Sequence, residues 1–78
     1  MARYYFDTRD YDALMQDDEG LECTSVAAAK KQAALSLAEL ACDVLPRSTK
    51  RVLAVEVRDE THSVLRAVLT FEATDLDR

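Results

Sequence analysis

The chain has 78 residues, of which 10 are basic and 15 acidic, so its formal net charge is −5 with the histidine neutral. Apolar residues make up 49% of the chain and charged residues 32%, a balance typical of a globular domain and not of a disordered tail. The negative charge argues against binding to phosphate backbones, and no apolar run approaches the roughly 20 residues of a membrane span. A chain of this length can build one hydrophobic core, so we expect a single domain over residues 1–78.

The two cysteines, Cys23 and Cys42, are too far apart to bond if the segment between them is helical. At about 1.5 Å per residue, a helix from Ser25 to Cys42 spans roughly 25 Å, whereas a disulfide needs Cα atoms within about 7 Å. The N-terminal residues also lack the apolar stretch of an export signal. Separate thiols and no export signal predict a reducing, cytoplasmic environment.

The N-terminal part predicts a β-hairpin followed by an acidic turn. Arg3–Thr8 is rich in aromatic residues and predicts a strand, and a short second strand is expected around Ala13–Gln16. Asp17-Asp18-Glu19-Gly20 has the residues of a turn, and its glycine, the only one in the chain, is expected to have a positive φ. This turn should end the hairpin and redirect the chain.

Residues Val26–Leu45 have the apolar periodicity of a helix, with Thr24-Ser25 as the N-cap and Pro46 as the residue that ends it. One apolar stripe runs along this helix, made of Val26, Ala29, Ala33, Leu37, Leu40, Ala41 and Val44. We expect this stripe to pack on a sheet.

The C-terminal third predicts a second hairpin, with strands at Arg51–Arg58 and Val64–Glu72. Residues expected to face the helix from the sheet are Tyr4, Phe6, Leu53, Val55, Val57, Leu65, Ala67, Leu69 and Phe71. The order ββαββ therefore predicts a two-layer α+β domain, with a four-stranded antiparallel sheet and one helix on one face. The favoured strand order is 2-1-3-4, and arrangements with the first strand at an edge stay open.

Three short motifs occur together, Arg3-Tyr4-Tyr5-Phe6, then Arg9-Asp10, then Asp17-Asp18-Glu19-Gly20 before an Ala-rich helix. This combination resembles a family of small uncharacterised bacterial proteins, a domain of unknown function, and the resemblance extends through the final hairpin. It supports the α+β fold and brings no assigned activity. Two residues depart from the family pattern: Asp7 stands where the family usually has histidine, and His62 replaces a glycine of the last turn. Any chemical role of that family histidine would be absent from this chain.

No combination of residues in the sequence is typical of catalysis. His62, the only imidazole, lies in the predicted tip of the last hairpin beside Asp59 and Glu60, where no pocket would orient it. The serines lack a partner set that would activate a nucleophile, and no glycine-rich loop could hold a nucleotide. We therefore predict that the protein is not an enzyme and has no catalytic residues and no cofactor.

Carboxylates are concentrated in the N-terminal part, at Asp7, Asp10, Asp12, Asp17, Asp18, Glu19 and Glu22. Hard cations such as calcium bind clusters of carboxylates, but an EF-hand loop needs alternating acidic residues, then a glycine and a closing glutamate. The spacing here does not match, so we predict solvated acidic turns and no metal site. A metal-dependent activity at these turns is a third hypothesis after the two given below.

The sheet face away from the helix is expected to carry the interaction residues, which are Tyr5, Val52, Ala54, Val64, Arg66 and Val68. Contiguous exposed apolar residues often mark association sites. The leading hypothesis is therefore a small, non-catalytic cytoplasmic module that binds itself or another protein. Leu35 and Cys42, on the outer side of the helix, form a second and smaller candidate surface.

The alternative hypothesis is an accessory factor that contacts nucleic acid, or a nucleic-acid-binding partner, through the basic residues of the sheet face. Net negative charge and the presence of a single aromatic residue on that face, Tyr5, disfavour nucleic acid as the partner. Pairing of the arginines with Asp7 and Glu56 would instead give an ordinary ion-paired sheet surface.

Overall fold

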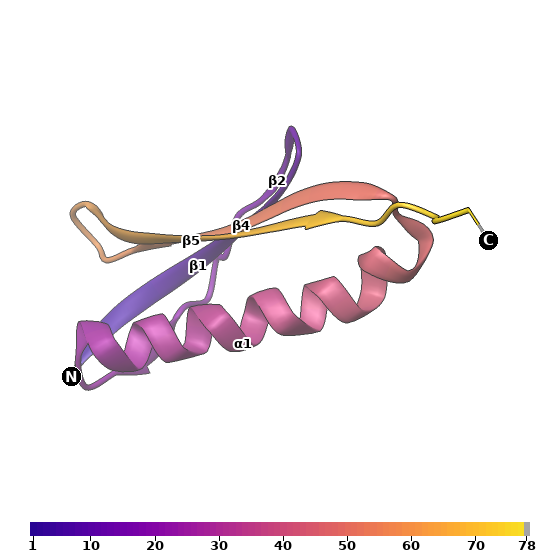
Figure 1. The fold of residues 1–78 in the computed structure, drawn as a ribbon. Coiled ribbons are helices and arrows are strands. Elements are labelled where there is room, and N and C mark those ends of the chain that lie inside the picture. Colours follow the sequence, from indigo (N-terminus) through magenta and orange to yellow (C-terminus); the bar gives the residue numbers. More distant parts are fainter. Residues whose placement is uncertain (78) are drawn as a thin grey trace.

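A computed structural model describes residues 1–77, which form one sheet and one long helix in two layers (Figure 1). In chain order the elements are β1 (Ala2–Asp10), β2 (Ala13–Met15), β3 (Leu21–Cys23), α1 (Val26–Val44), the 3₁₀ turn η1 (Leu45–Arg47), β4 (Lys50–Arg58) and β5 (Ser63–Glu72). The predicted α+β architecture with one helix against an antiparallel sheet is confirmed.

The sheet has the order β2-β1-β4-β5, and β3 also pairs with β1. This path is the predicted 2-1-3-4 order, with an additional strand that was not predicted. β2 pairs with the end of β1, where Thr8 lies opposite Met15, and β3 pairs with its start, where Tyr4 lies opposite Leu21. The acidic turn therefore does not end the hairpin. It interrupts a strand that continues along the outer edge of β1.

Helix α1 begins and ends close to the predicted residues. The Ser25 hydroxyl accepts a hydrogen bond from the Ala28 N–H (3.1 Å), which satisfies one of the donors left free in the first turn. Pro46 lies in η1, where the helical path ends. Among residues 1–77 no helix combines the length and the apolar character that crossing a membrane requires.

The core lies between α1 and the sheet, and most of it was predicted. Its buried apolar residues are Tyr4, Cys23, Ala29, Ala33, Leu37, Val44, Leu53, Val55 and Val57. Leu40 is partly buried and packs against this core, as the predicted stripe requires. Two expectations need correction. Phe71 lies outside this cluster, and Val26 is exposed although it belongs to the predicted stripe. Both cysteines are free, with Cys23 buried and Cys42 exposed.

Gly20 has a φ of +75°, as predicted, and there is no room for a side chain at this position. A Cβ would lie 2.9 Å from the Arg3 Cγ, 2.9 Å from the Tyr5 Cε2 and 3.0 Å from the Tyr4 carbonyl oxygen. The glycine thus allows the acidic turn to pass directly over the side chains of β1.

Replacing Gly20 with alanine should lower the free energy of unfolding by at least about 1 kcal/mol, because the left-handed backbone and the close contacts are both unfavourable for a Cβ. Urea unfolding measures this difference. Gly20→Asn is the control, since asparagine tolerates a positive φ while it introduces the same Cβ. A Gly20→Ala variant as stable as the wild type would contradict the strained turn.

Candidate interaction surface

The sheet face opposite α1, called the open face here, is organised in rows that cross the strands. One row joins Asp7, Glu56 and Arg66, and the next joins Arg9, Ala54 and Val68. The first row is charged, and the second includes two of the predicted apolar residues. The open face therefore has a polar half toward the start of β1 and a more apolar half toward its end.

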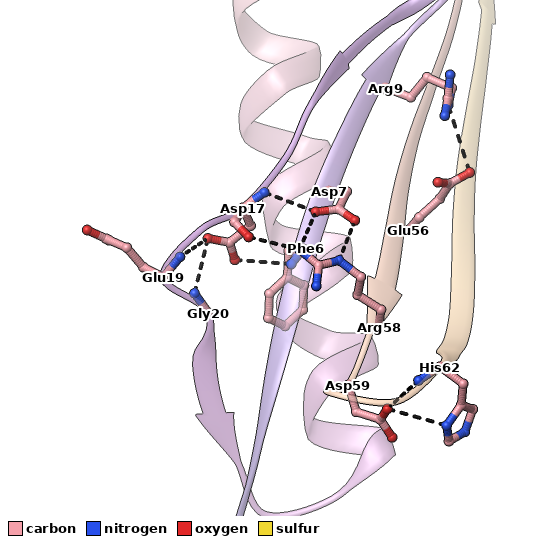
Figure 2. Close-up of polar contacts among 10 residues, drawn as sticks. All are labelled: Phe6, Asp7, Arg9, Asp17, Glu19, Gly20, Glu56, Arg58, Asp59 and His62. Carbon is pink, nitrogen blue, oxygen red and sulfur yellow. Dashed lines mark hydrogen bonds and ion pairs between the residues drawn. The ribbon is translucent and has the colours of Figure 1, made fainter.

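The polar half is centred on Asp7, which is only 7% exposed. The Arg58 Nε donates a hydrogen bond to Asp7 Oδ2 (2.8 Å), and its Nη2 donates to the Asp17 carbonyl oxygen (3.1 Å; Figure 2). The Arg58 guanidinium also lies over the Tyr5 ring, 4.6 Å from its centroid. A carboxylate this buried needs a paired cation, and Arg58 provides it from the neighbouring strand.

Asp17 connects this cluster to the outer edge of β1. Its carboxylate accepts hydrogen bonds from the backbone N–H groups of Phe6 (3.1 Å), Glu19 (3.0 Å) and Gly20 (3.1 Å), and its own N–H donates to Asp7 Oδ1 (3.0 Å; Figure 2). Phe6 lies between the segments of β1 that pair with β2 and β3, so the Asp17 carboxylate replaces the missing strand at this gap. Burial acts to raise the pKa of Asp17, but these N–H donors and the nearby Arg58 charge lower it overall.

Three further arginines of the sheet are also paired, as the alternative of an ion-paired surface predicted. Glu56 Oε2 lies 3.8 Å from the Arg9 Nε and 3.4 Å from the Arg66 Nε. Arg3 pairs with Glu22 at 3.3 Å, near the start of β1. Each of these arginines therefore has a carboxylate partner within the chain.

The apolar half combines buried and exposed side chains. Ala54 is buried between its neighbours on β1 and β5, whereas Val68 is 52% exposed and Val52 41% exposed. Leu14 lies opposite Arg9 on β2 and is also exposed. Apolar side chains are thus accessible along the row that leads to the outer strand β5.

A family described as "Domain of unknown function (DUF6894)" matches residues 3–72. The chain belongs to this family. The match extends from the second residue of β1 to the last residue of β5, so the DUF6894 domain comprises the whole sheet and the helix. A search of curated proteins and a search of solved structures each found no significant match.

The structure places five of the six predicted interaction residues of the DUF6894 domain on the open face and one elsewhere. Val64 packs against the core together with its neighbour Leu65. The reason is an irregularity in the pairing of β4 and β5, where Val57 lies opposite Leu65 but Arg58 lies opposite Ser63. This bulge leaves Val64 without a partner on β4 and turns it toward the helix side.

The other residues with chemical potential in the DUF6894 domain are used in local structure. The Asp59 carboxylate accepts hydrogen bonds from the backbone N–H groups of Thr61 and His62, which lower its pKa. The His62 ring is exposed and its Nδ1 lies 3.3 Å from Asp59 Oδ1. Within the described residues, no three His, Cys, Asp or Glu side chains are grouped so that they could hold a metal ion.

Proposed function

We propose that the protein is a non-catalytic cytoplasmic interaction module that associates with a second copy of itself, through an interface that includes Val68 on β5. The observation that carries this proposal is the exposed apolar half of the open face, where Val68 and Val52 extend to the outer strand. A domain of this size has a small core, and association is one way in which small domains gain stability.

The pairing of charges supports a protein partner over nucleic acid. Binding to a nucleic-acid backbone requires arginine and lysine side chains that are free to neutralise phosphates and so displace the counterions condensed on them. On the open face, Arg9, Arg58 and Arg66 each lie beside a carboxylate of the same sheet. A partner that adds apolar contacts next to these neutralised charges fits this surface better than a polyanion does.

Sedimentation of the wild-type protein at micromolar concentrations should show a dimer, and Val68→Asp should raise its dissociation constant at least about tenfold. The reason is that each copy would place a charge within an apolar contact. Leu35→Asp is the matched control, because Leu35 is 50% exposed on the outer side of α1 and lies on the second candidate surface. A wild-type protein that remains monomeric at high concentration would refute self-association. A dimer disrupted by Leu35→Asp alone would move the interface to the helix.

A further inference from the structure

The two long sides of the sheet differ in how their backbone groups are satisfied. The outer side of β1 is covered by β2, by β3 and, between them, by the Asp17 carboxylate. The strand β5 is ten residues long and pairs, within residues 1–77, with β4 alone. It contains no proline and no bulge-forming insertion after Leu65. Exposed edges of this kind are normally shortened, charged or covered, because they are ready to pair with another strand.

The hydrogen bonds of β5 show which groups face outward. The Ala73 N–H donates to the Thr49 carbonyl (2.8 Å), in the same register that places Phe71 opposite Arg51. In an antiparallel ladder, residues alternate between those bonded to the neighbouring strand and those turned away from it. The odd-numbered residues of β5 therefore bond to β4. The residues that turn their N–H and C=O groups to the free edge are Arg66, Val68, Thr70 and Glu72.

The C-terminal half of helix α1 is apolar on the flank beside this edge, whereas Lys30 and Lys31 lie on the same flank nearer its start. Ala41, Cys42 and Leu45 of this flank line a groove of about 370 Å³ together with Pro46 and Phe71 of β5. Ala34 and Ala38 continue the same flank at helical spacing. The opposite flank carries the polar residues Gln32, Ser36, Glu39 and Asp43. The C-terminal half of the helix thus presents an apolar surface on the side where the sheet is open.

We propose that a second copy pairs antiparallel with β5 across a two-fold axis at Leu69, an inference that rests on the self-association proposed above. This register places Arg66 of one copy opposite Glu72 of the other at both ends of the contact, and Val68 opposite Thr70. The Arg66 Nε lies 3.4 Å from Glu56 Oε2, but its side chain is 60% exposed, so in this register its outer guanidinium N–H groups would face the exposed Glu72 of the other copy. On the helix side, Leu69 meets Leu69 and Phe71 meets Ala67, next to the apolar flanks of the two helices.

Charge complementarity selects this register among those that keep the faces of the two sheets aligned. An axis at Val68 would place Arg66 opposite Thr70, and Glu72 opposite Val64, which packs against the core. An axis at Thr70 would leave Arg66 opposite Thr74, beyond the end of β5. The axis at Leu69 pairs every outward-facing residue of β5 from Arg66 to Glu72 and forms two cross-strand ion pairs.

Two charge reversals test the register. Arg66→Glu and Glu72→Arg should each raise the dissociation constant of the homodimer about tenfold, because each places like charges opposite one another at both ends. An equimolar mixture of the two variants should form a heterodimer of near wild-type affinity, because one end of the contact keeps the native Arg66–Glu72 pair and the other end has the same pair with its signs exchanged. Native mass spectrometry distinguishes the three dimers by mass. Arg66→Glu mixed with Glu60→Arg is the matched control, since Glu60 lies in the β4–β5 loop, and this mixture should show no such rescue.

A backbone variant tests the edge itself. Thr70→Pro removes an outward N–H and leaves the bonds to β4 in place, so it should abolish the dimer, whereas Thr70→Val should retain it. Circular dichroism tests whether Thr70→Pro is folded. If it is unfolded, the mixture of the two charge-reversal variants decides whether the β5 edges pair. Edge pairing would be overturned if Thr70→Pro were as dimeric as the wild type. It would also be overturned if the mixture of charge-reversal variants showed no preference for the heterodimer. In both cases self-association itself would stand. A monomeric wild type would refute the self-association on which the inference rests.

Discussion

Replacing Leu53 with alanine should lower the free energy of unfolding by about 2–5 kcal/mol, the largest effect that we expect from one substitution in this protein. Leu53 is completely buried at the centre of β4. It lies between Asp10 on β1 and Leu69 on β5, with α1 covering it. Removing its branched side chain loses apolar burial and leaves a cavity that neighbouring strands, fixed by their ladders, cannot fill.

Urea unfolding followed by circular dichroism measures this loss as a lower midpoint with an unchanged slope. Leu35→Ala is the matched control, because it makes the same chemical change on the exposed side of α1, where we expect a change within about 0.5 kcal/mol. Equal effects of the two substitutions would show that α1 does not cover β4.

Replacing Asp17 with alanine should lower the free energy of unfolding by about 2–3 kcal/mol. One carboxylate accepts the backbone N–H groups of Phe6, Glu19 and Gly20, and without it these donors lose their acceptor at once. The effect should be largest at Phe6, whose amide lies in the partly buried gap between β2 and β3. Asp18→Ala is the control, because Asp18 is exposed on the same turn. Similar losses for both variants would contradict the role of Asp17 as a substitute for a strand.

The pH dependence provides a second measurement of the same contact. The pKa of Asp17 is lowered in the folded protein, so the stability that its charge contributes is complete above the unfolded value and is lost as the pH falls through the folded one. The difference in unfolding free energy between wild type and Asp17→Ala should therefore shrink as the pH falls from 7 toward 2. Asp10 and Asp59 also have lowered pKa values, so the variant should retain part of the acid sensitivity.

Periodicity was sufficient to predict the main elements of the fold. The apolar stripe of α1 and the alternation in β1, β4 and β5 each extend over many residues, so a single exception does not hide the pattern. The segments that were missed are short. β3 has three residues, too few to show alternation, and the bulge at Val64 has no residue type that would signal it. Both depend on pairing with a distant strand, which the local sequence does not specify.

The candidate surface was predicted only in part, again because the local sequence does not specify which residues of distant strands lie opposite one another. Alternation alone places Val52, Ala54 and Val68 on the open face, and the structure has them there. The contact between Asp7 and Arg58 depends on the register of β1 against β4, which no local pattern encodes. The role of Asp17 had a clearer signal, since an aspartate three residues before the only glycine is typical of a side chain that closes its own turn.

The position of β1 has a consequence for synthesis of the chain. β1 is made before β4, yet its central place in the sheet requires β4, which is made after the whole of α1. Until Lys50–Arg58 have left the ribosome, β2 and β3 are the partners of β1 in the described sheet that have already been made, and both lie on one side of it. The N–H and C=O groups of its other side then have no strand to bond, and its aromatic residues have no completed core to cover them. We therefore expect the nascent chain to be more prone to aggregation before β4 has emerged than after the sheet is complete.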